Sequence, residues 1–418
     1  MINTTLCYIQ KDNKFLMLHR NKKENDINAE KWIGVGGKFE NMETVEECLI
    51  REVLEETGLT LLKFEYVGLV KFKSDIYEDE DMYLFLGTDF SGELISDCAE
   101  GTLEWIDLDE VCGLPTWEGD KYFLEALMKG RRNLNMTLNY EGDRLVEVED
   151  IDDAVVPNKS CKINSPHGFS TRIGGVSDGI YKSLNLGMNR GDIKERVIEN
   201  WRRYLNACDI GYRPIVCGEQ VHGNTVHIAT VEDAFFPYMV PQLIKADGYV
   251  TNVENLPLCI FSADCVPVLL EDINAGVVGA VHSGWRSTVA DIEKEAVGKM
   301  LSLGAKTDNI CIAIGPAIDR CSFEVGEEVV IAVDKMLGEN ETNEMYYKKD
   351  NGKYMLDLRN VVRKRFIQLG IPEKNIELVG GCTMCNYDTY FSHRYTNGKR
   401  GSMASVIMLK KENCSAEN

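Results

Sequence analysis

The chain lacks the features that would place it in a membrane or on a secretory route. It holds no run of about 18 or more apolar residues, the length that a membrane-spanning helix needs. Its first residues, MINTTLCYIQKDNKFLML, carry charges inside what would be the apolar core of a signal peptide. The 14 cysteines are scattered along the chain, which favours free thiols in a reducing compartment. We therefore expect a cytoplasmic protein without a membrane span.

Positive charge is also in short supply. The 46 lysines and arginines face 67 aspartates and glutamates, and the net charge is -21. An acidic protein repels the phosphate backbone of nucleic acid, so we expect no polymeric DNA or RNA partner. Small phosphorylated substrates stay compatible with this charge, because a bound divalent cation inverts it locally.

The length of 418 residues predicts two domains, and neither repeats nor low-complexity tracts interrupt them. We place a mixed α/β domain at 1–150, a polar linker at 151–160, a second α/β domain at 161–412 and a tail at 413–418. The first domain has predicted strands at 4–10, 14–19, 64–72, 82–89 and 104–107 and helices at 44–57 and 120–129. The second has predicted strands at 215–217, 226–230, 248–251, 258–262, 266–272, 277–282, 310–314, 376–379 and 402–409, and helices at 193–208, 287–303, 324–337 and 356–369.

Three carboxylates gather on one flank of the predicted helix 44–57. Glu52, Glu55 and Glu56 stand at i, i+3 and i+4 beside the apolar face. Like charges at this spacing destabilise a helix by roughly 0.2–0.5 kcal/mol per pair. Such a cluster indicates either a solvated acidic face or a site for a hard cation such as Mg²⁺, which prefers oxygen ligands.

The segment GKFENMETVEECLIREVLEETGL, which starts at Gly37, resembles the Nudix box G-x5-E-x7-R-E-U-x-E-E-x-G-U, where U is apolar. The resemblance implies an α/β/α sandwich in which Glu52, Glu55 and Glu56 hold Mg²⁺ or Mn²⁺, one of them serving as the catalytic base. It also implies that Arg51 and Glu43 brace the preceding loop. The defined positions are filled by Gly37, Glu43, Arg51, Glu52, Val53, Glu55, Glu56, Gly58 and Leu59, and Gly37 and Lys38 are expected substrate contacts.

The flanking segments KWIGVGGKFE and LPTWEGD resemble those of MutT-type 8-oxo-dGTP diphosphatases. This resemblance implies that Glu100 completes the metal site and that Trp117 and Asp120 bind the purine by stacking and hydrogen bonding. On its own, Trp117 is equally compatible with a packed surface aromatic residue. Ile33 stands where some members carry a base-reading asparagine, so a nucleotide sugar or ADP-ribose remains an alternative substrate.

Only six histidines occur, and two of them stand in distinctive segments, EQVHGNTV and GAVHSGWRS. Between them, Cys265 follows an apolar strand. A thiolate and two imidazoles from His222, Cys265 and His282 form a donor set that suits a catalytic zinc ion with one open position. No local spacing rule joins the three residues, so a buried thiol and two ordinary polar histidines are the alternative.

Several blocks of residues 160–410 resemble the YfiH-like family, whose proteins are also called laccase-domain or polyphenol-oxidase-like. The blocks are HGFSTRIGGVSDGIYKSLNLG, EQVHGNTV, ADG, SADCVPVLL, GAVHSGWRS, IGPAIDRCSFEVG, CTMCNYDTYFSHR and GSMASV. The resemblance implies Zn²⁺ bound by His222, Cys265 and His282, with Cys265 in the catalytic centre. It further implies phosphorolysis of adenosine, inosine or methylthioadenosine, and adenosine deamination. A blue multicopper oxidase binds its copper ions largely through histidines in His-x-His pairs. Because this chain has six histidines and no such pair, the sequence excludes that class.

Further polar residues are candidates for the second site. We expect Arg172, in a glycine-rich loop, and Arg286 to bind the phosphate, although surface salt bridges are an equal alternative. Asn185 is a candidate substrate contact. Asp264, next to Cys265, either orients a ligand or shuttles a proton, or else only forms the turn that ends the strand.

Cys382 and Cys385 form a C-x-x-C pair with no second pair elsewhere in the chain. The pair does not begin a βαβ unit, as a redox motif would, and it makes a poor zinc site alone. A structural role is the favoured interpretation, and a contribution to the substrate pocket is the alternative.

Taken together, the sequence predicts a bifunctional enzyme whose partners are purine nucleotides, purine nucleosides and phosphate. The first domain would hydrolyse a purine nucleoside triphosphate to the monophosphate and pyrophosphate. The second would be a zinc-dependent purine nucleoside phosphorylase and deaminase, including methylthioadenosine phosphorylase activity. For the second domain, a peptidoglycan-precursor editing hydrolase and a non-catalytic binding module are the alternatives. The sequence leaves the oligomeric state open.

Overall fold

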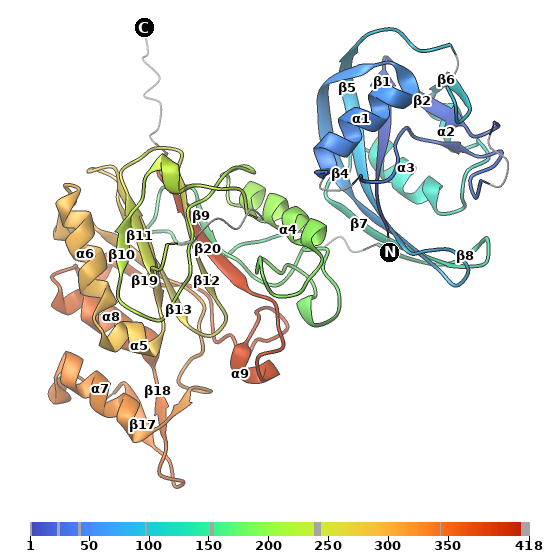
Figure 1. The fold of residues 1–418 in the computed structure, drawn as a ribbon. Helices are drawn as coiled ribbons and strands as arrows, with labels where there is room; N and C mark the ends of the chain where they lie inside the picture. Colours follow the sequence, from blue (N-terminus) through green and yellow to red (C-terminus); the bar gives the residue numbers. More distant parts are fainter. Residues whose placement is uncertain are drawn as a thin grey trace, which may run out of the picture. The chain divides into compact units, whose positions relative to one another are not determined.

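The computed structural model describes residues 2–22, 26–40, 43–96, 98–150, 154–237, 244–342 and 344–410. They divide into two compact units, Met1–Asp152 and Asp153–Asn418 (Figure 1). Within the predicted linker, Asn158 pairs with Phe169 and the Ser160 hydroxyl bonds to Glu377, so 154–160 belong to the second unit. Residues 151–153 and the predicted tail lie outside the described residues. No described helix combines the length and the apolarity needed to cross a membrane.

The first unit is built on a mixed sheet with the strand order β3-β2-β1-β5-β4-β7-β8, and β6 pairs with β2. Its strands are β1 (Ile2–Lys11), β2 (Lys14–His19), β3 (Trp32–Ile33), β4 (Thr60–Ser74), β5 (Glu80–Ser91), β6 (Thr102–Asp107), β7 (Leu134–Glu141) and β8 (Arg144–Asp150). Its helices are α1 (Val45–Thr57), α2 (Leu108–Val111) and α3 (Asp120–Met128).

Alternation along β1 places the two longer helices on opposite faces of this sheet. Successive side chains of a strand point to opposite faces. The Thr5 hydroxyl lies 3.5 Å from the Cys48 sulfur on α1, whereas the Tyr8 ring packs 6.4 Å from the ring of Phe123 on α3. The unit is therefore the predicted α/β/α sandwich.

Local signals set both ends of α1, the helix that carries the acidic cluster. The Thr44 side chain accepts from the Glu47 backbone N–H, and the Glu47 carboxylate accepts from the Thr44 N–H, which forms a capping box. At the other end Gly58 has a φ of 74°, and its N–H bonds to the Leu54 carbonyl.

The described part of the second unit contains three sheets, with the strand orders β10-β11-β14-β13-β15-β19, β12-β20-β9 and β16-β18-β17. Its strands are β9 (His167–Phe169), β10 (Val226–Ile228), β11 (Gly248–Thr251), β12 (Pro257–Ser262), β13 (Val266–Asp272), β14 (Val277–Ser283), β15 (Cys311–Ile314), β16 (Glu324–Val325), β17 (Tyr346–Lys348), β18 (Tyr354–Leu356), β19 (Ile376–Leu378) and β20 (Met403–Met408). Its α-helices are α4 (Lys194–Ala207), α5 (Trp285–Val289), α6 (Ile292–Ser302), α7 (Glu327–Leu337), α8 (Leu358–Gln368) and α9 (His393–Thr396).

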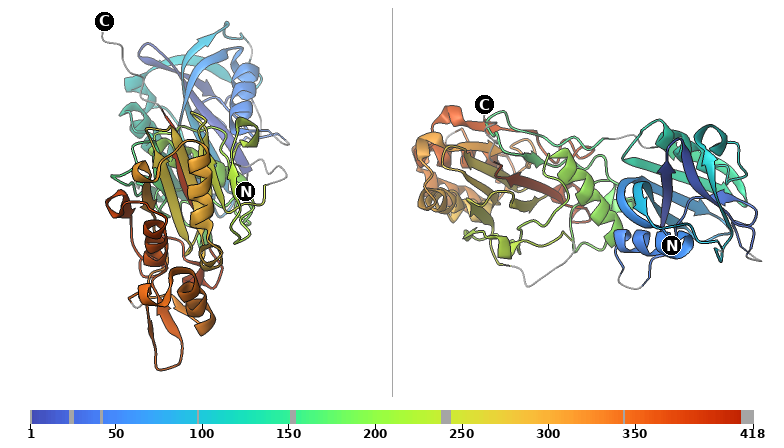
Figure 2. Two further views of the ribbon diagram at one scale, coloured as in Figure 1. Left: turned by 90° about the vertical axis from the view of Figure 1, so that its left-hand side faces the viewer. Right: turned by 90° about the horizontal axis from the view of Figure 1, so that it is seen from above.

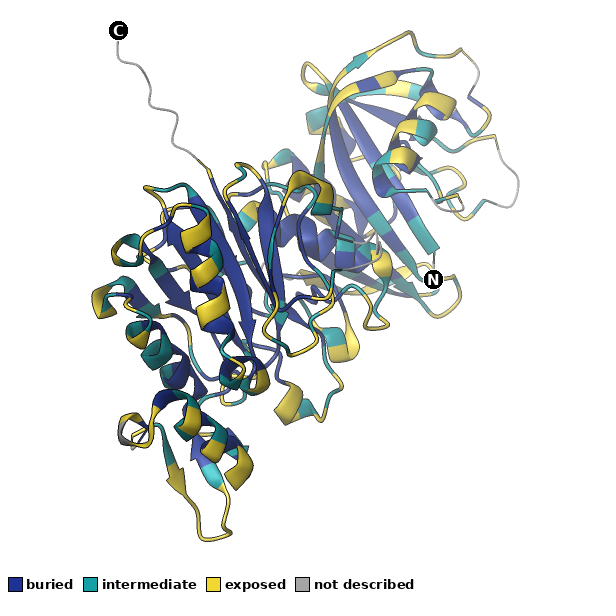
Figure 3. Cartoon of the chain, turned by 60° about the vertical axis from the view of Figure 1, so that its left-hand side comes forward, coloured by how far each residue is buried: buried dark blue, intermediate teal, exposed yellow. Residues whose placement is uncertain are grey.

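The same alternation rule stacks these elements into layers, seen edge-on in the right-hand view of Figure 2. On β13, Leu270 packs under α6 and α8, while Leu269 faces the β12-β20-β9 sheet. On β12, Leu258 faces the main sheet, while Cys259 packs against Trp201 of α4. Strands β9, β11, β13, β14 and β20 are buried throughout, whereas α6 exposes its outer face (Figure 3). The order is thus helices, main sheet, second sheet and α4, which confirms the predicted α/β layered class.

Strand register brings two of the predicted metal ligands together. β13 and β14 are antiparallel neighbours, with Pro267 opposite His282 and Val266 opposite Ser283. Cys265 directly precedes β13, so it lies beside His282 at the end of β14. His222 arrives from the segment before β10, which pairs with β11, the next strand of the same sheet.

Two predicted helices differ from the structure. The predicted helix 287–303 is two helices, α5 and α6, because Asp291 adopts a left-handed φ of 70° between them. Both carboxylate oxygens of Asp291 accept bonds from Arg365, at 2.7 Å each, and stabilise this break. The predicted helix 324–337 begins only at Glu327, because residues 324–325 form strand β16 with β18.

Candidate active sites

The first unit has a cavity of about 520 Å³ that is lined in part by residues of β1 and of the loop before α1. Glu52, Glu56 and Glu100 line it, whereas Glu55 does not. The Glu55 side chain is 61% exposed and accepts a 3.3 Å bond from Arg51. Glu56 is buried and accepts a 3.0 Å bond from the Gly36 N–H. The structure therefore brings three of the four predicted metal ligands to one cavity and leaves Glu55 outside its lining.

Arg51 and Glu43 join the loop before α1 to the helix itself. Arg51 donates to both Glu43 oxygens at 2.8 Å and to the Lys38 carbonyl at 3.1 Å. These bonds raise the Arg51 pKa well above its usual range and lower that of Glu43. Gly37 lies in the same loop, where a Cβ would stand 2.5 Å from the Glu52 carboxylate. Close approach of loop and carboxylate therefore requires glycine at this position.

An arginine that the sequence did not single out stands among the carboxylates. Arg20 pairs with Glu100, lies 2.7 Å from Asp26 and approaches Glu56 to 4.0 Å. All four residues line the cavity. Carboxylate oxygens gathered in this way fit a hard divalent cation, which would take over the charge-neutralising position of the guanidinium.

The base-binding residues predicted from the MutT resemblance line the same cavity. The Trp117 indole N–H donates to the Asn28 side-chain oxygen at 2.8 Å, and the Lys31 ammonium lies 4.3 Å from the ring centre. Burial raises the pKa of Asp120 to about 7. Ile33 contributes an apolar wall, and Asn28 brings an amide to the cavity that the sequence did not predict.

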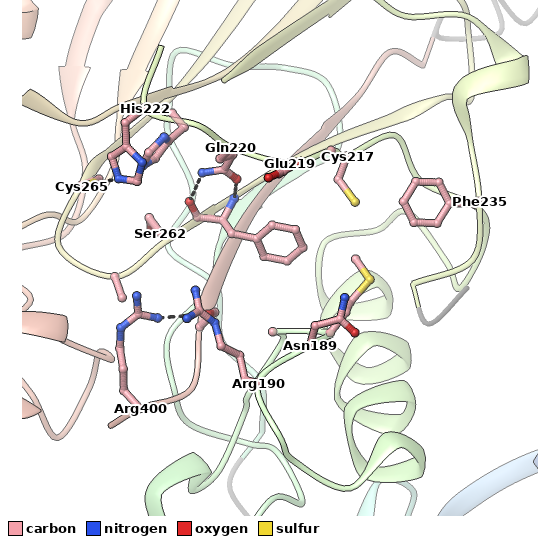
Figure 4. A pocket seen from close by; sticks show the side chains of 17 residues that line it. Asn189, Arg190, Cys217, Glu219, Gln220, His222, Phe235, Ser262, Cys265 and Arg400 are labelled. Atoms are coloured by element: carbon pink, nitrogen blue, oxygen red, sulfur yellow. Dashed lines mark hydrogen bonds between the residues drawn. The ribbon is translucent and has the colours of Figure 1, made fainter. Parts of the chain in front are cut away.

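In the second unit, the potential ligand atoms of His222, Cys265 and His282 lie within 4.8 Å of one another. The Cys265 sulfur is 4.0 Å from His222 Nε2, and the two imidazole rings stand at 88° to each other (Figure 4). A Cβ on Gly284 would approach the Cys265 sulfur to 3.2 Å, so this glycine leaves room for the cluster. A thiolate and two imidazoles are ligands that both zinc and copper accept.

A buried carboxylate fixes the orientation of this cluster. Asp247 lies 2.8 Å from His282 Nδ1 and accepts the backbone N–H groups of Val221, His222 and Gly223. Because Nδ1 is bonded to Asp247, His282 offers Nε2 to a metal ion. Burial alone would raise the Asp247 pKa, but His282 and these N–H groups outweigh it and lower the pKa.

The same environment favours the thiolate form of Cys265. Burial alone would raise its pKa, but the adjacent imidazoles of His282 and His222 outweigh that effect and lower the pKa to about 6. Thiolate is the form that binds a metal ion. The cluster therefore fits a single metal ion held by one sulfur and two nitrogens.

A cavity of about 350 Å³ opens onto this cluster and contains two arginines. Arg190 and Arg400 lie across it from His222 and Cys265 (Figure 4). Burial, together with the nearby Arg190, lowers the pKa of Arg400 to about 10. Phe235 and Phe261 supply apolar wall. The arrangement joins a metal-ligand cluster, two cationic groups and aromatic surface.

The predicted substrate contacts Arg172, Asn185 and Arg286 do not line this cavity. Arg172 donates instead to the Lys182 and Tyr387 carbonyls and stacks 4.6 Å from the Phe391 ring centre. Arg286 is exposed and lies 4.4 Å from the Trp285 ring centre. The expectation that the two arginines contact substrate anion directly is therefore not supported by their positions.

Two of the remaining predicted residues shape the cavity from behind. Asn185 is buried, and its side-chain oxygen accepts the N–H groups of Ser402 and Gly187, both of which line the cavity. Asp264 accepts from the Thr383 hydroxyl at 2.6 Å and the Arg394 N–H at 2.7 Å. Its carboxylate thus ties the turn before Cys265 to two later loops.

The fold and the two cavities define a two-domain enzyme. Residues 166–410 match the family described as multi-copper polyphenol oxidoreductase laccase, and the chain belongs to this family. Residues 2–127 match the NUDIX domain. The resemblances to the Nudix and YfiH-like families are thereby confirmed. NUDIX domains use divalent metal ions, and the laccase-like family binds a metal, copper or zinc.

Relatives of known name match the second unit. A purine nucleoside phosphorylase of Bacteroides thetaiotaomicron is 34% identical over 253 residues, which are 59% of this chain and 93% of that protein. Adenosine deaminase RL5, from an unknown prokaryotic organism, is 32% identical over 273 residues, 64% of this chain and 100% of that protein. The crystal structure of the hypothetical protein YfiH from Bacillus licheniformis is 33% identical in sequence, with a TM-score of 0.55. The match covers 58% of this chain and 92% of the YfiH chain.

Proposed function

We propose that the first unit hydrolyses a purine nucleoside triphosphate, preferably oxidised as in 8-oxo-dGTP, to the monophosphate and pyrophosphate. The observation that carries this proposal is the shared cavity of Glu52, Glu56, Glu100, Trp117 and Asp120. The carboxylates would hold Mg²⁺, with Glu55 reaching it only after a change of rotamer. When bound, this ion polarises a phosphoryl oxygen and promotes attack by water.

The other residues of the cavity would orient the substrate. Below about pH 7 Asp120 carries a proton, so it can donate a hydrogen bond to a base acceptor as well as accept one. The Asn28 amide N–H can donate to a purine carbonyl, because its oxygen is the atom that faces the Trp117 N–H. Ile33, Phe72 and Met82 supply apolar surface for the base. These groups favour a purine that carries an oxygen over an unmodified adenine.

A substrate panel with Mg²⁺ tests the proposal. We expect the highest kcat/KM for 8-oxo-dGTP, followed by dGTP, and lower values for dATP, nucleotide sugars and ADP-ribose. Asn28→Ala should remove the preference for the two guanine-type bases over dATP. Equal turnover of all these substrates would contradict the proposed base selectivity. Hydrolysis of ADP-ribose or a nucleotide sugar in preference to every triphosphate would assign the domain to another nucleoside diphosphate derivative.

We propose that the second unit binds Zn²⁺ through His222, Cys265 and His282 and catalyses phosphorolysis of adenosine, inosine or methylthioadenosine. The carrying observation is that Arg190 and Arg400 face the metal-ligand cluster across one cavity. Two guanidinium groups can hold a phosphate by charge-assisted hydrogen bonds. When bound, the zinc ion acts as a Lewis acid.

The remaining walls would place the nucleoside against this phosphate. Gln220 donates to the Phe261 carbonyl at 2.8 Å and accepts its N–H at 2.6 Å, so the aromatic residue is held in place. Phe261 and Phe235 offer apolar faces for a purine. Phosphate held by the arginines would attack C1′ of the ribose as the bond to the base breaks, which releases the free purine.

Adenosine deamination is a second candidate function of this cavity, favoured by the full-length match to adenosine deaminase RL5. An assay of adenosine with and without phosphate, with products separated by mass, distinguishes adenine from inosine. We expect Arg400→Met to abolish phosphate-dependent adenine release. Turnover of neither kind, in a protein that does not retain zinc, would favour a binding module. Hydrolysis of a peptidoglycan precursor alone would favour the editing hydrolase.

A further inference from the structure

Three cysteines form a cluster apart from the cavity that His222, Cys265 and His282 line. The sulfurs of Cys321, Cys382 and Cys385 lie within 4.8 Å of one another. Cys385 is 3.1 Å from Cys321, although 64 residues separate them in the sequence. Cys382 is buried, and the other two are exposed. The loop after β15 therefore supplies the third thiol that the C-x-x-C pair lacks in the sequence.

Backbone contacts hold the two loops in this position. Ala317 pairs with Cys382 in a parallel bridge, and the Thr383 N–H donates to the Ala317 carbonyl at 3.0 Å. The Asp319 N–H donates to the Cys382 sulfur at 3.4 Å. The Ser322 hydroxyl lies 3.1 Å from the Cys385 sulfur. Hydrogen-bond donors aimed at sulfur are the surroundings that stabilise a metal-bound thiolate.

We propose that Cys321, Cys382 and Cys385 form a second metal site that binds one thiolate-preferring ion of the zinc type. Sulfurs at the usual zinc distance of about 2.3 Å stand roughly 3.8 Å apart around a tetrahedral ion. The observed separations start at 3.1 Å between Cys321 and Cys385 and stay within 4.8 Å, so binding would move these two sulfurs apart by less than an ångström. A disulfide would join only two of these thiols, whereas one ion uses all three. The two exposed cysteines leave the fourth position to a solvent molecule.

This site stabilises the wall of the catalytic cavity. Thr383, between the cysteines of the C-x-x-C pair, donates to Asp264 at 2.6 Å. Asp264 directly precedes Cys265 and has a left-handed φ of 96°, so the turn depends on such contacts. The bound ion fixes the loop that carries Thr383 and thereby the turn that presents Cys265. Its role is structural, and it does not depend on the proposed reaction.

The test uses the full chain with Cys265→Ala, which removes the only thiolate of the catalytic cluster. The metal-stripped, reduced protein is titrated with Co²⁺, and thiolate-to-cobalt absorption and native mass report the ions bound. We expect one thiolate-bound ion per chain. Adding Cys321→Ser and Cys385→Ser should remove it, whereas adding Cys161→Ser, an exposed thiol outside the cluster, should leave it.

Three results overturn the proposal. The first is that Cys265→Ala binds no thiolate-bound ion, and the second is that binding is unchanged after the two serine substitutions. The third is that the untreated protein has an intact mass lower than that of the reduced protein by the mass of two hydrogen atoms, and that this difference disappears in Cys321→Ser. The last result assigns a disulfide. As a check that needs no variant, native mass spectrometry of the unsubstituted chain before and after treatment with a chelator counts the bound zinc ions. Because Cys265→Ala already disables the proposed catalytic site, failure here leaves the proposed phosphorolysis untouched.

Discussion

At the scale of single residues, neighbours far along the chain decide what each polar side chain does. The Arg172 guanidinium donates to backbone carbonyls, one of them 215 residues away in the sequence. It is therefore not available to bind an anion in the cavity. Arg190 lies three residues after the SLNLG block and Arg400 directly before GSMASV, but neither arginine belongs to a quoted block. Family motifs in the sequence could therefore single out the three candidate metal ligands, which the fold brings within 4.8 Å of one another, but not the arginines that face them.

Asp120 gives the first unit a pH-dependent stability. Its carboxyl has a pKa of about 7 in the fold, raised by burial from an ordinary value of 3.8. Between these values the unfolded chain has lost the proton and the folded chain has not, so stability falls as pH rises. We expect Asp120→Asn to remove this fall, which makes the variant more stable above about pH 7 by up to about 4 kcal/mol.

Urea unfolding at about pH 4, 6 and 8 measures the effect. The gain should be near zero at the lowest pH and largest at the highest. Asp89→Asn is the matched control, since that residue is exposed near the end of β5. A gain for Asp120→Asn that does not change with pH would contradict the assigned burial cost.

Asp247 is expected to act on the metal through His282. Because it bonds the Nδ1 side of the ring at 2.8 Å, Asp247→Asn should weaken zinc binding by roughly 10–100-fold. Chelator competition in a background that carries Cys321→Ser and Cys385→Ser measures that change at the catalytic cluster alone. Asp233→Asn breaks a comparable 3.0 Å contact with His227, outside the cavity, and should leave zinc affinity unchanged. Equal affinities for both variants would remove the positioning role of Asp247.

At the scale of elements, the predictions succeeded where local signals act and failed where tertiary contacts decide. Helix α1 has its capping box, its period and its terminal glycine within one segment, and its observed bounds differ from the prediction by one residue. The break between α5 and α6 depends on Arg365, far along the chain. The hairpin of β7 and β8 is an exception, because apolar and polar residues alternate from Leu134 to Glu141 and Gly142 lies in the turn, a local signal that the prediction did not use.

The capping box of α1 should contribute measurably to the first unit. Thr44→Ala removes the side-chain acceptor for the Glu47 N–H, at 3.2 Å, and should lower the free energy of unfolding by about 1 kcal/mol. Urea unfolding of the full chain reads the change in the transition of this unit. Thr116→Ala, which loses a hydroxyl bonded only to a neighbouring carbonyl, serves as control. A Thr44→Ala curve that superimposes on the wild-type curve would show that the cap contributes nothing.

At the scale of the whole molecule, each compact unit has its own buried core and its own polar cavity. The acidic cavity is lined by residues of the first unit alone, and the cavity with the thiol and imidazoles by residues of the second alone. Both proposed substrates are purines, which agrees with a shared role in purine turnover. The two proposed reactions therefore use no catalytic residue in common, although both take place on one chain.

Reciprocal inactivation of the full chain tests this independence most directly. Glu56→Gln and His282→Ala are each assayed for Mg²⁺-dependent triphosphate hydrolysis and for phosphate-dependent release of the base from a nucleoside. We expect Glu56→Gln to abolish only the first activity and His282→Ala only the second. Undiminished nucleotide hydrolysis in Glu56→Gln, or loss of both activities in either folded variant, would contradict this expectation.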